Sequence, residues 1–362
     1  MAKKVTMVEI AKELHCSVSV VSRALNDKYG VSSETRAKVR IKAMKMGFDF
    51  KNIVENGRGK RKNDAPHINV VVTQKDLLDE CFYLKILYSI EDALTRRQAE
   101  FSLSILDGRQ ESLWVDMKRN GAAGVIVMGL VPNEELLAIM SSGLPLVLVD
   151  TALLDLSLDR ITVNNYRGSY LATNYLIERG HRDISFVGIQ EYSFSFDERY
   201  RGYRKGIQAL ENRGYAVRPE ATRLWDIEEG ETLLSSPQRP TAVVCANDRL
   251  ALRISETADR LGLTIPRDLS VIGFDDIDKC EWVSPRLTSV YYPKQELGEE
   301  AVKLILERIA QRQISTRLVQ MDTHIVERES VANGPALMEG EKPLPLGLEI
   351  AGAIPAGVRR AR

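Results

Sequence analysis

The sequence has few of the patterns that mark secreted or membrane proteins. Its four cysteines are far apart and form no CxxC pair, so it suggests neither a disulfide framework nor a zinc site. No apolar run approaches the ~18 residues of a membrane span, and the N-terminal residues lack the apolar core of a secretory signal. We therefore expect buried thiols and a cytoplasmic protein without a membrane partner.

The sequence also lacks the motifs of common enzyme classes. It contains no Walker loop, no GxGxxG after a strand and no GxSxG, and its four histidines have no metal-ligand spacing. We predict that the protein is not an enzyme and has no cofactor and no metal site. With 44% apolar and 28% charged residues, the chain should fold as a globular protein, and 362 residues predict two or more structural units.

Positive charge is concentrated at the N-terminal end. The whole chain holds 50 basic and 50 acidic residues, but residues 1–62 hold 15 basic and 6 acidic ones, a net charge of +9. The remainder therefore carries −9. Such an asymmetry is typical of a nucleic-acid-binding segment, and a solvated basic bundle is the alternative.

This basic segment predicts three short helices. Thr6 with Glu9 fits a capping box at the start of the first helix. The Ser17 hydroxyl can cap a second helix that ends at the Asn26-Asp27 break, and a third is expected over residues 33–47. Three residues separate the first two helices, which forces a helix-turn-helix angle and leaves one face of the second helix available to a partner.

The remainder of the chain predicts an α/β fold. Short apolar, β-branched runs alternate with helix-length segments, which is typical of doubly wound parallel sheets covered on both faces. The cleft between two such lobes is the expected ligand site. The expected strands are 68–72, 101–106, 124–128, 146–150, 184–188, 242–246 and 270–274.

We expect four segments along the chain. Residues 1–51 form the helix-turn-helix head, and the polar, basic residues 52–66 form a hinge or linker. Residues 67–333 form a two-lobed body for effector binding and dimerisation. Residues 334–362 are rich in proline and glycine, which predicts a disordered tail without a tetramerising coiled coil.

The order of these segments and several local strings resemble the lactose-repressor (LacI/GalR) family of bacterial transcription regulators. The resemblance covers residues 5 to about 330. The head string is VTMVEIAKELHCSVSVVSRALNDKYGVSSETRAKV. The body strings include DRITVNNYRGSYLATNYLIERGHRDISFVG, ERYRGY, AVVCANDRLAL, LGLTIPRDLSVIGFDDID and SPRLTSV. The family has a helix-turn-helix head and a periplasmic-binding-protein-like body.

The resemblance implies base-reading roles for Val18, Ser19 and Arg23. An arginine fork can donate to guanine O6 and N7, a serine can pair with several base edges, and a valine offers methyl contact to thymine. Contacts to DNA phosphates, which fix register without reading sequence, are implied for Thr6, Ser17, Ser22 and Asn26. For Thr6 and Ser17, helix capping is a compatible alternative role.

The sequence departs from the family in the turn and the hinge. His15 stands where the family has glycine, so this residue is expected to adopt a positive φ. Gly57 replaces the leucine that wedges into the minor groove, and Phe50 replaces the preceding proline, which disfavours a hinge helix. Phosphate or minor-groove contacts are left to Arg58, Lys60, Arg61 and Lys62, and a solvated linker is the alternative.

In the body, the resemblance implies effector contacts by residues that follow strands or begin helices. Carboxylates, an amide and a guanidinium suit a polyhydroxylated ligand, whose hydroxyls both donate and accept. These residues are Asp150, Arg199, Asn247 and Asp275. Phe82 resembles the family's ring-packing aromatic, and a core position is its alternative. For Asp276 or Asp278 we expect a helix N-cap instead.

The resemblance implies a sequence-specific DNA-binding transcriptional regulator, specifically a repressor. It should act as a homodimer on operator DNA, with allosteric control by a small effector, which we expect to be a carbohydrate. A nucleoside, purine or other metabolite acting as corepressor is the alternative effector. A cytoplasmic solute-binding protein is the alternative of another class, and the DNA-binding head argues against it.

Overall fold

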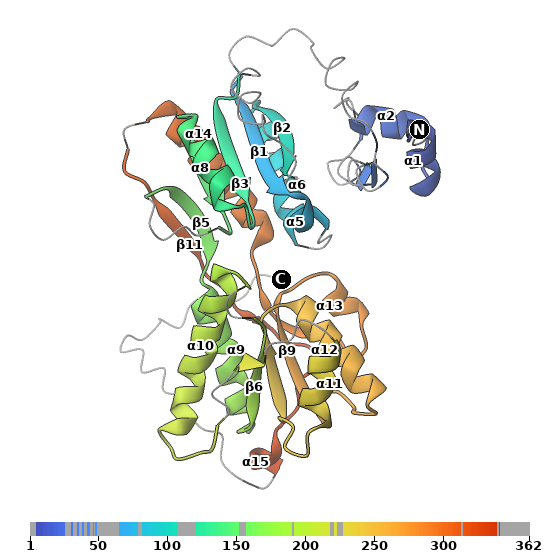
Figure 1. Cartoon of the computed structure of the whole chain (residues 1–362), viewed down its shortest axis with the longest axis vertical. Helices are drawn as coiled ribbons and strands as arrows, with labels where there is room; N and C mark the ends of the chain where they lie inside the picture. The colour runs from blue at the N-terminus through green and yellow to red at the C-terminus, as the bar shows by residue number, and fades with distance from the viewer. Residues whose placement is uncertain are drawn as a thin grey trace, which may run out of the picture. The chain divides into compact units, whose positions relative to one another are not determined.

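The structure is a computed structural model in which two compact units can be described (Figure 1). Unit 1 holds the described residues of Met1–Asn164, Ser193–Ser195 and Tyr291–Thr323, and unit 2 holds those of Asn165–Tyr192, Phe196–Val290 and His324–Arg362. The residues described are 5–25, 30–31, 35, 38–39, 42–43, 46, 48, 65–78, 82–106, 121–151, 157–189, 192–217, 221–222, 227–312, 314–338 and 340.

The head begins with the capping box that the sequence predicts. In α1, Met7–Glu13, the Glu9 amide donates to the Thr6 hydroxyl over 3.3 Å, and the Thr6 amide donates to the Glu9 carboxylate over 2.9 Å. In α2, Val18–Leu25, the amide of Val20 donates to the hydroxyl of Ser17 over 3.2 Å. Both predicted caps are therefore confirmed, and they satisfy amides that a helix start leaves unpaired.

The head has its own hydrophobic core. Its buried members are Ile10, Ala11, Val21, Ala24, Leu25, Val39 and Ala43. Within the expected third helix, the structure describes helical backbone at residues 35, 38–39 and 42–43, and the ends predicted near Ser33 and Gly47 lie outside the described residues. Buried apolar residues of α1, α2 and this segment thus pack together.

Unit 1 contains a parallel sheet with the strand order β11-β5-β4-β3-β1-β2. Its strands are β1 His67–Thr73, β2 Glu100–Leu106, β3 Gly124–Met128, β4 Leu146–Val149, β5 Asp159–Val163 and β11 Leu318–Met321. Its helices are α5 Gln74–Leu78, α6 Tyr83–Arg96, α8 Asn133–Ser141 and α14 Lys294–Ala310. α6 and α14 pack against each other, and α14 also packs on β3, β4 and β5.

Unit 2 contains a second sheet with the order β12-β10-β9-β8-β6-β7. Its strands are β6 Ile184–Val187, β7 Ala221–Thr222, β8 Ala242–Cys245, β9 Ser270–Asp275, β10 Thr288–Tyr291 and β12 Ile325–Val326. Its helices are α9 Asn165–Glu178, α10 Phe194–Glu211, α11 Ile227–Ser235, α12 Asp248–Arg260, α13 Lys279–Trp282 and α15 Pro335–Met338. Helices α9 and α10 lie on one side of this sheet and α11 and α12 on the other (Figure 1).

The α/β class with parallel sheets is confirmed, as is a strand at every expected position. The sequence patterns did not predict β5, β7, β10, β11 and β12. Several of these are short, and β11 alternates between exposed and half-buried residues, so it lacks the continuous apolar run of a central strand. In β12, which pairs antiparallel with β10, both residues are half-buried.

The expectation of disorder from Gly334 onward is wrong for the first residues of that segment. The amide of Gly334 donates to the carbonyl of Arg179 over 2.7 Å, and α15 follows directly. Gly180 has a φ of +87°, and a Cβ there would lie 2.7 Å from the backbone nitrogen of Leu337. Two glycines thus let the backbones approach closely enough to pair, which composition alone does not reveal.

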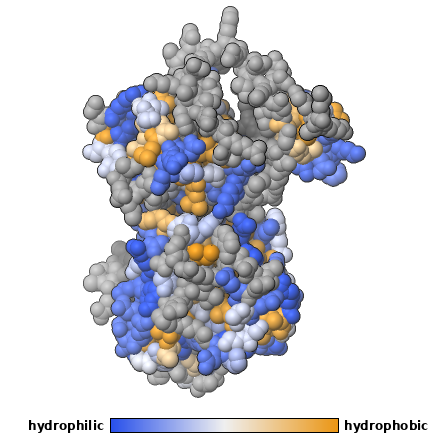
Figure 2. All heavy atoms as spheres, viewed as in Figure 1, coloured by the Kyte–Doolittle hydropathy of each residue, from blue (hydrophilic) through white to orange (hydrophobic). Residues whose placement is uncertain are grey.

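The described residues contain no helix long and apolar enough to cross a membrane. On the face drawn in Figure 2, hydrophilic residues predominate and hydrophobic residues are scattered. Cys245 and Cys280 are buried, as expected, and burial raises the pKa of both thiols. Cys16 is half-buried, and Cys81 lies outside the described residues.

Candidate functional site: a DNA-reading helix and two sheet edges

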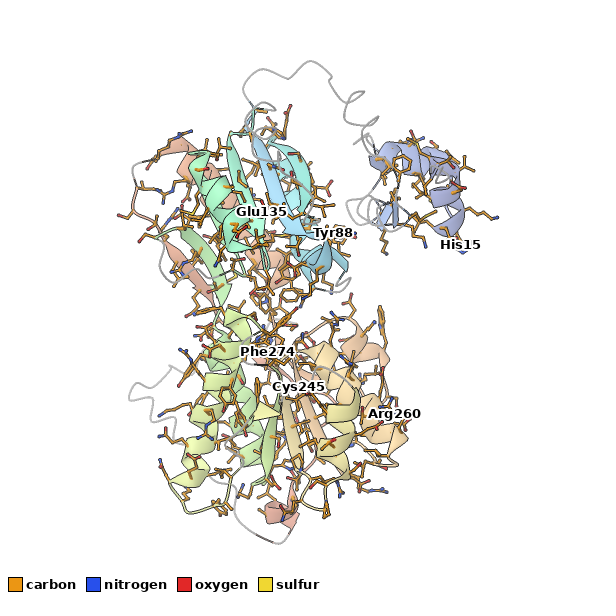
Figure 3. The ribbon with its side chains drawn as sticks, viewed as in Figure 1. His15, Tyr88, Glu135, Cys245, Arg260 and Phe274 are labelled. Atoms are coloured by element: carbon orange, nitrogen blue, oxygen red, sulfur yellow. The ribbon has the colours of Figure 1, made fainter. Side chains whose placement is uncertain are left out.

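The turn between α1 and α2 is built around a residue with left-handed backbone. His15 has a φ of +48°, as predicted from its position in the turn (Figure 3). The amide of Cys16 donates to the carbonyl of Ala11 over 3.0 Å, and the amide of His15 donates to that of Lys12 over 3.3 Å. This is the Schellman pattern that ends a helix and redirects the chain. The tight turn therefore forms without glycine.

The turn leaves one side of α2 facing outward. The apolar residues Val21, Ala24 and Leu25 are buried in the head core. The predicted DNA contacts Thr6, Ser17, Val18, Ser19 and Arg23 are exposed, and Ser22 is half-buried. Val18 is 42% exposed, so its methyl groups are accessible for an apolar contact with a partner. The predicted contacts Asn26, Arg58, Lys60 and Arg61 lie outside the described residues.

In unit 1, a cluster of aromatic side chains surrounds Asp150 at the carboxyl end of β4. Tyr83 and Tyr292 each donate a hydroxyl hydrogen bond to a different Asp150 carboxylate oxygen, both over 2.8 Å. Phe82 packs edge-on against both tyrosines, with ring centroids 4.8 and 4.7 Å away. Burial and the charge of Asp150 raise the pKa of Tyr83, so its hydroxyl stays a donor.

The backbone at Asp150 also departs from ordinary strand geometry. Asp150 has a φ of +54°, and its amide donates to the carbonyl of Ile161 over 3.0 Å. The hydroxyl of Thr151 donates to the carbonyl of Gly129. These bonds fix the backbone of Asp150 and Thr151 at the end of the sheet, where doubly wound folds bind their ligands.

In unit 2, Arg199 is held on three sides at the carboxyl ends of β8 and β9. Its Nε donates to Asn165 over 2.8 Å, and its Nη1 donates to the carbonyl of Ala246 over 2.6 Å. Its Nη2 lies 3.2 Å from Oδ1 of Asp275. The guanidinium carbon lies 3.7 Å from the ring centroid of Phe274, which Figure 3 labels. The side chain is 3% exposed, so its orientation is fixed.

Asn247 occupies the N-cap of α12, beside this cluster. Its side-chain oxygen accepts from the amide of Leu250 over 3.0 Å. The cap uses the oxygen of this side chain and leaves its amide nitrogen as a donor outside the cap. Asn247 therefore combines a capping acceptor with donors that can serve a ligand.

The expected N-cap position is found at Asp278 and not at Asp276. Asp278 occupies the N-cap position of α13 but makes no side-chain cap hydrogen bond, because its backbone is already helical. Asp276 instead forms an ion pair with Arg328 over 2.7 Å.

Several residues of these clusters were missed by sequence reasoning. Asn165, Tyr83 and Tyr292 contribute polar contacts, and Phe274 contributes the ring under Arg199. Tyr83 directly follows Phe82, the predicted ring-packing aromatic, so its position in the sequence could have indicated a role at the same site. Tyr292 is 142 positions from its partner Asp150, and no local pattern indicates such a pairing.

Together, a helix-turn-helix head and a body of two parallel sheets with polar clusters at their carboxyl edges define a ligand-responsive DNA-binding protein. Residues 6–48 match the model for bacterial regulatory proteins of the lacI family, and residues 173–331 match the periplasmic binding protein-like domain.

Two relatives are named HTH-type transcriptional repressor PurR. The one from Pectobacterium carotovorum subsp. carotovorum (strain PC1) is 30% identical over 347 residues, which cover 92% of this chain and 98% of the relative. The one from Yersinia enterocolitica serotype O:8 / biotype 1B (strain NCTC 13174 / 8081) is 30% identical over 344 residues, with 91% and 98% covered. The chain belongs to the lacI family and is a DNA-binding transcriptional repressor of that family.

Solved structures share the fold. A complex of the transcriptional regulator CelR with cellobiose is similar with a TM-score of 0.65 and 24% identity, covering 90% of this chain and 100% of that one. The lac repressor dimer bound to operator and the anti-inducer ONPF is similar with a TM-score of 0.64 and 21% identity, covering 91% and 100%.

Proposed function

We propose that the chain is a homodimeric repressor whose operator affinity is set by a polyhydroxylated effector, most simply a carbohydrate. We infer the chemical class of the effector from the Arg199–Asp275 ion pair, which has Asn165 and Asn247 beside it. Fixed donors and acceptors within one cluster suit vicinal hydroxyls, each of which donates and accepts. Structural neighbours of the chain include complexes with cellobiose and ribose.

In unit 1, Asp150 is the proposed effector contact. The hydroxyls of Tyr83 and Tyr292 hold its carboxylate at the carboxyl end of β4, where it can accept a hydrogen bond from a ligand hydroxyl. Phe82 would offer its ring to the apolar face of the sugar. The same ring, with Tyr83 and Tyr292, could pack against a purine base, so a nucleoside or purine corepressor is the second candidate.

On DNA, we propose that α2 enters the major groove with Val18, Ser19 and Arg23 toward base edges. Thr6, Ser17, Ser22 and Asn26 would contact phosphates, with Arg58, Lys60 and Arg61 along the backbone or minor groove. One head reads only a few base pairs, so two heads related by a two-fold axis would read a near-palindromic operator. Binding to chromosomal operators implies a cytoplasmic protein.

A thermal-shift screen of mono- and disaccharides against nucleosides and purine bases tests the effector class, because a ligand of the native state raises the melting temperature. A hit must then change operator affinity in a fluorescence anisotropy titration. Asp275→Ala should lose the response, whereas Asp268→Ala, near the amino end of β9 and paired with Arg267, should keep it. A full response in Asp275→Ala would discard the site.

A further inference from the structure

Two consecutive aspartates after β9 have left-handed backbone. Asp275 has a φ of +109° and Asp276 a φ of +50°. Residues with side chains rarely adopt such angles, and they persist only where the surroundings hold them. Asp275 is the partner of Arg199, so the shape of this turn determines where the proposed effector contact lies.

A buried carboxylate, Asp248, holds the turn from beneath. It is fully buried at the start of α12. The amide of Ile277 donates to its Oδ2 over 2.9 Å, and the hydroxyl of Ser289 donates to its Oδ1 over 2.6 Å. Ser289 in turn accepts from the amide of Asp276 over 3.2 Å. Asp248 therefore holds the backbone amides of both residues that follow Asp275 by hydrogen bonds, that of Ile277 directly and that of Asp276 through Ser289.

The approach of Asp248 to β9 depends on Gly273. A Cβ at Gly273 would lie closer to Oδ1 of Asp248 than any real contact allows. Arg328 fixes the turn from another direction, because its Nη2 lies 2.7 Å from Oδ1 of Asp276 and its Nη1 donates to the carbonyl of Leu287 over 2.9 Å. The turn is thus held by groups from three other segments of unit 2.

We propose that Asp248 is a positioning residue for effector recognition. Through Ser289 and the amide of Ile277, it keeps Asp275 in the left-handed conformation that presents its carboxylate beside Arg199. The inference rests on the proposed role of Asp275 in effector binding. It adds that effector recognition by the unit 2 cluster depends on Asp248, a side chain that does not contact the effector. Supporting residues at other binding sites likewise act by holding the residues that contact the ligand.

Three variants test this. Asp248→Asn replaces an acceptor oxygen by a donor, so a hydrogen bond to the Ile277 amide or to the Ser289 hydroxyl is lost. Ser289→Ala removes the bridge to Asp276, and Ser289→Thr restores a hydroxyl on a strand residue. Ser330→Ala is the matched control, because its buried hydroxyl accepts from Thr288 and donates to the carbonyl of Val271 near the amino end of β9.

Hydrogen exchange of the full chain gives the first readout. Asp248→Asn and Ser289→Ala should speed exchange of the amides of residues 276 and 277, with Ser289→Thr close to wild type and Ser330→Ala leaving these amides protected. Uniform acceleration across unit 2 in Asp248→Asn and Ser289→Ala, or no change at these amides, would overturn the proposal, since either outcome means that Asp248 has no specific hold on the turn.

Calorimetry with cellobiose as the probe gives the second readout. Asp248→Asn and Ser289→Ala should weaken cellobiose binding by about ten-fold, because each variant loses a hydrogen bond to a charged group. Undiminished binding by both, with binding lost in Asp275→Ala, would refute the inference alone. Undiminished binding by Asp275→Ala would refute the proposed function instead. Exchange at residues 276 and 277 decides the positioning step whether or not this probe binds.

Discussion

Nη2 of Arg199 lies 3.2 Å from Oδ1 of Asp275, and both side chains are almost fully buried. Removing one member of a buried pair leaves an uncompensated charge, so Arg199→Ala should destabilise the protein by about 3–5 kcal/mol. Arg201→Ala, an exposed arginine on the same helix, should change little. Urea denaturation measures both. Adding Asp275→Asn to Arg199→Ala should recover stability, and its failure to do so would show that the pair is not the cause.

Close packing of α9 and α10 predicts a second stability effect. A Cβ at Gly202 would collide with the backbone carbonyl oxygen of Tyr166. Alanine gains about 1 kcal/mol of helix propensity over glycine, but overpacking against backbone costs about 1–3 kcal/mol or more. Gly202→Ala should therefore lower the melting temperature, whereas Gln208→Ala on the exposed side of α10 should not. A stabilised Gly202→Ala variant would contradict the packing.

His181 predicts a pH dependence of stability. Burial lowers its pKa from 6.5 to about 4, and its Nε2 lies 3.2 Å from the carbonyl oxygen of Ala332, to which it donates. Because the folded pKa is below the unfolded one, this contribution is complete above pH 6.5. It is lost as pH falls toward 4, where the unfolded state binds the proton more tightly.

The loss amounts to about 3 kcal/mol. Between pH 7 and 4, the denaturation midpoint should fall less with decreasing pH in His181→Gln than in wild type. In His324→Gln, at an exposed position, the midpoint should depend on pH as in wild type. Equal slopes in all three proteins would rule out His181 as the source.

Arg23 predicts a change in sequence preference. Arg23→Ala should cost about 1–3 kcal/mol and relax the preference at one base pair per half-site. Lys60→Ala should instead weaken binding to all sequences and reduce the salt dependence. Selection of binding sites from a random pool measures the first effect and salt titrations the second. A wild-type sequence preference in Arg23→Ala would show that the recognition-helix assignment is wrong.

The hinge predicts a weakly bent operator. Residues 52–64 lie outside the described residues, so this expectation rests on Gly57 and Gly59, which disfavour a helix, and on the missing leucine. Without a wedge, the central base step should not unstack. Circularly permuted operator fragments should therefore show little bending, and Gly57→Leu should increase it at a flexible central step. A sharp kink with the wild-type protein would implicate another residue, first Ile53 or Val54.

Sequence patterns predicted the parts of the fold that depend on neighbouring residues. The capping box of Thr6 and Glu9 and the apolar central strands are local properties, and both are present. The positive φ of His15 was expected from the resemblance, which places glycine at this position. Sequence patterns did not predict edge strands such as β11, whose residues have no continuous apolar run.

The sequence predicted individual residues of the candidate site but not the contacts between them. Asp150 and Asp275 were identified through the resemblance, but the partners that orient them were not. Tyr292 and Ser289 come from distant segments, and a tyrosine or serine in a strand or loop carries no local sign of such a role. The contacts of Asp276 and α15 differ from expectation because they depend on Arg328 and Gly180, which approach only in the folded unit.

Neither unit is a continuous stretch of chain, which matters for synthesis on the ribosome. Unit 1 takes its last helix and edge strand from Tyr291–Thr323, after most of unit 2 has been made. Until then β3 lacks α14, whose Ile305 side chain packs on Gly124. A nascent chain that stops before residue 294 must therefore expose the apolar face of β3 and β4. Such a truncated product is a natural substrate for chaperones, and the N-terminal part of unit 1, Met1–Asn164, should aggregate when it is expressed alone.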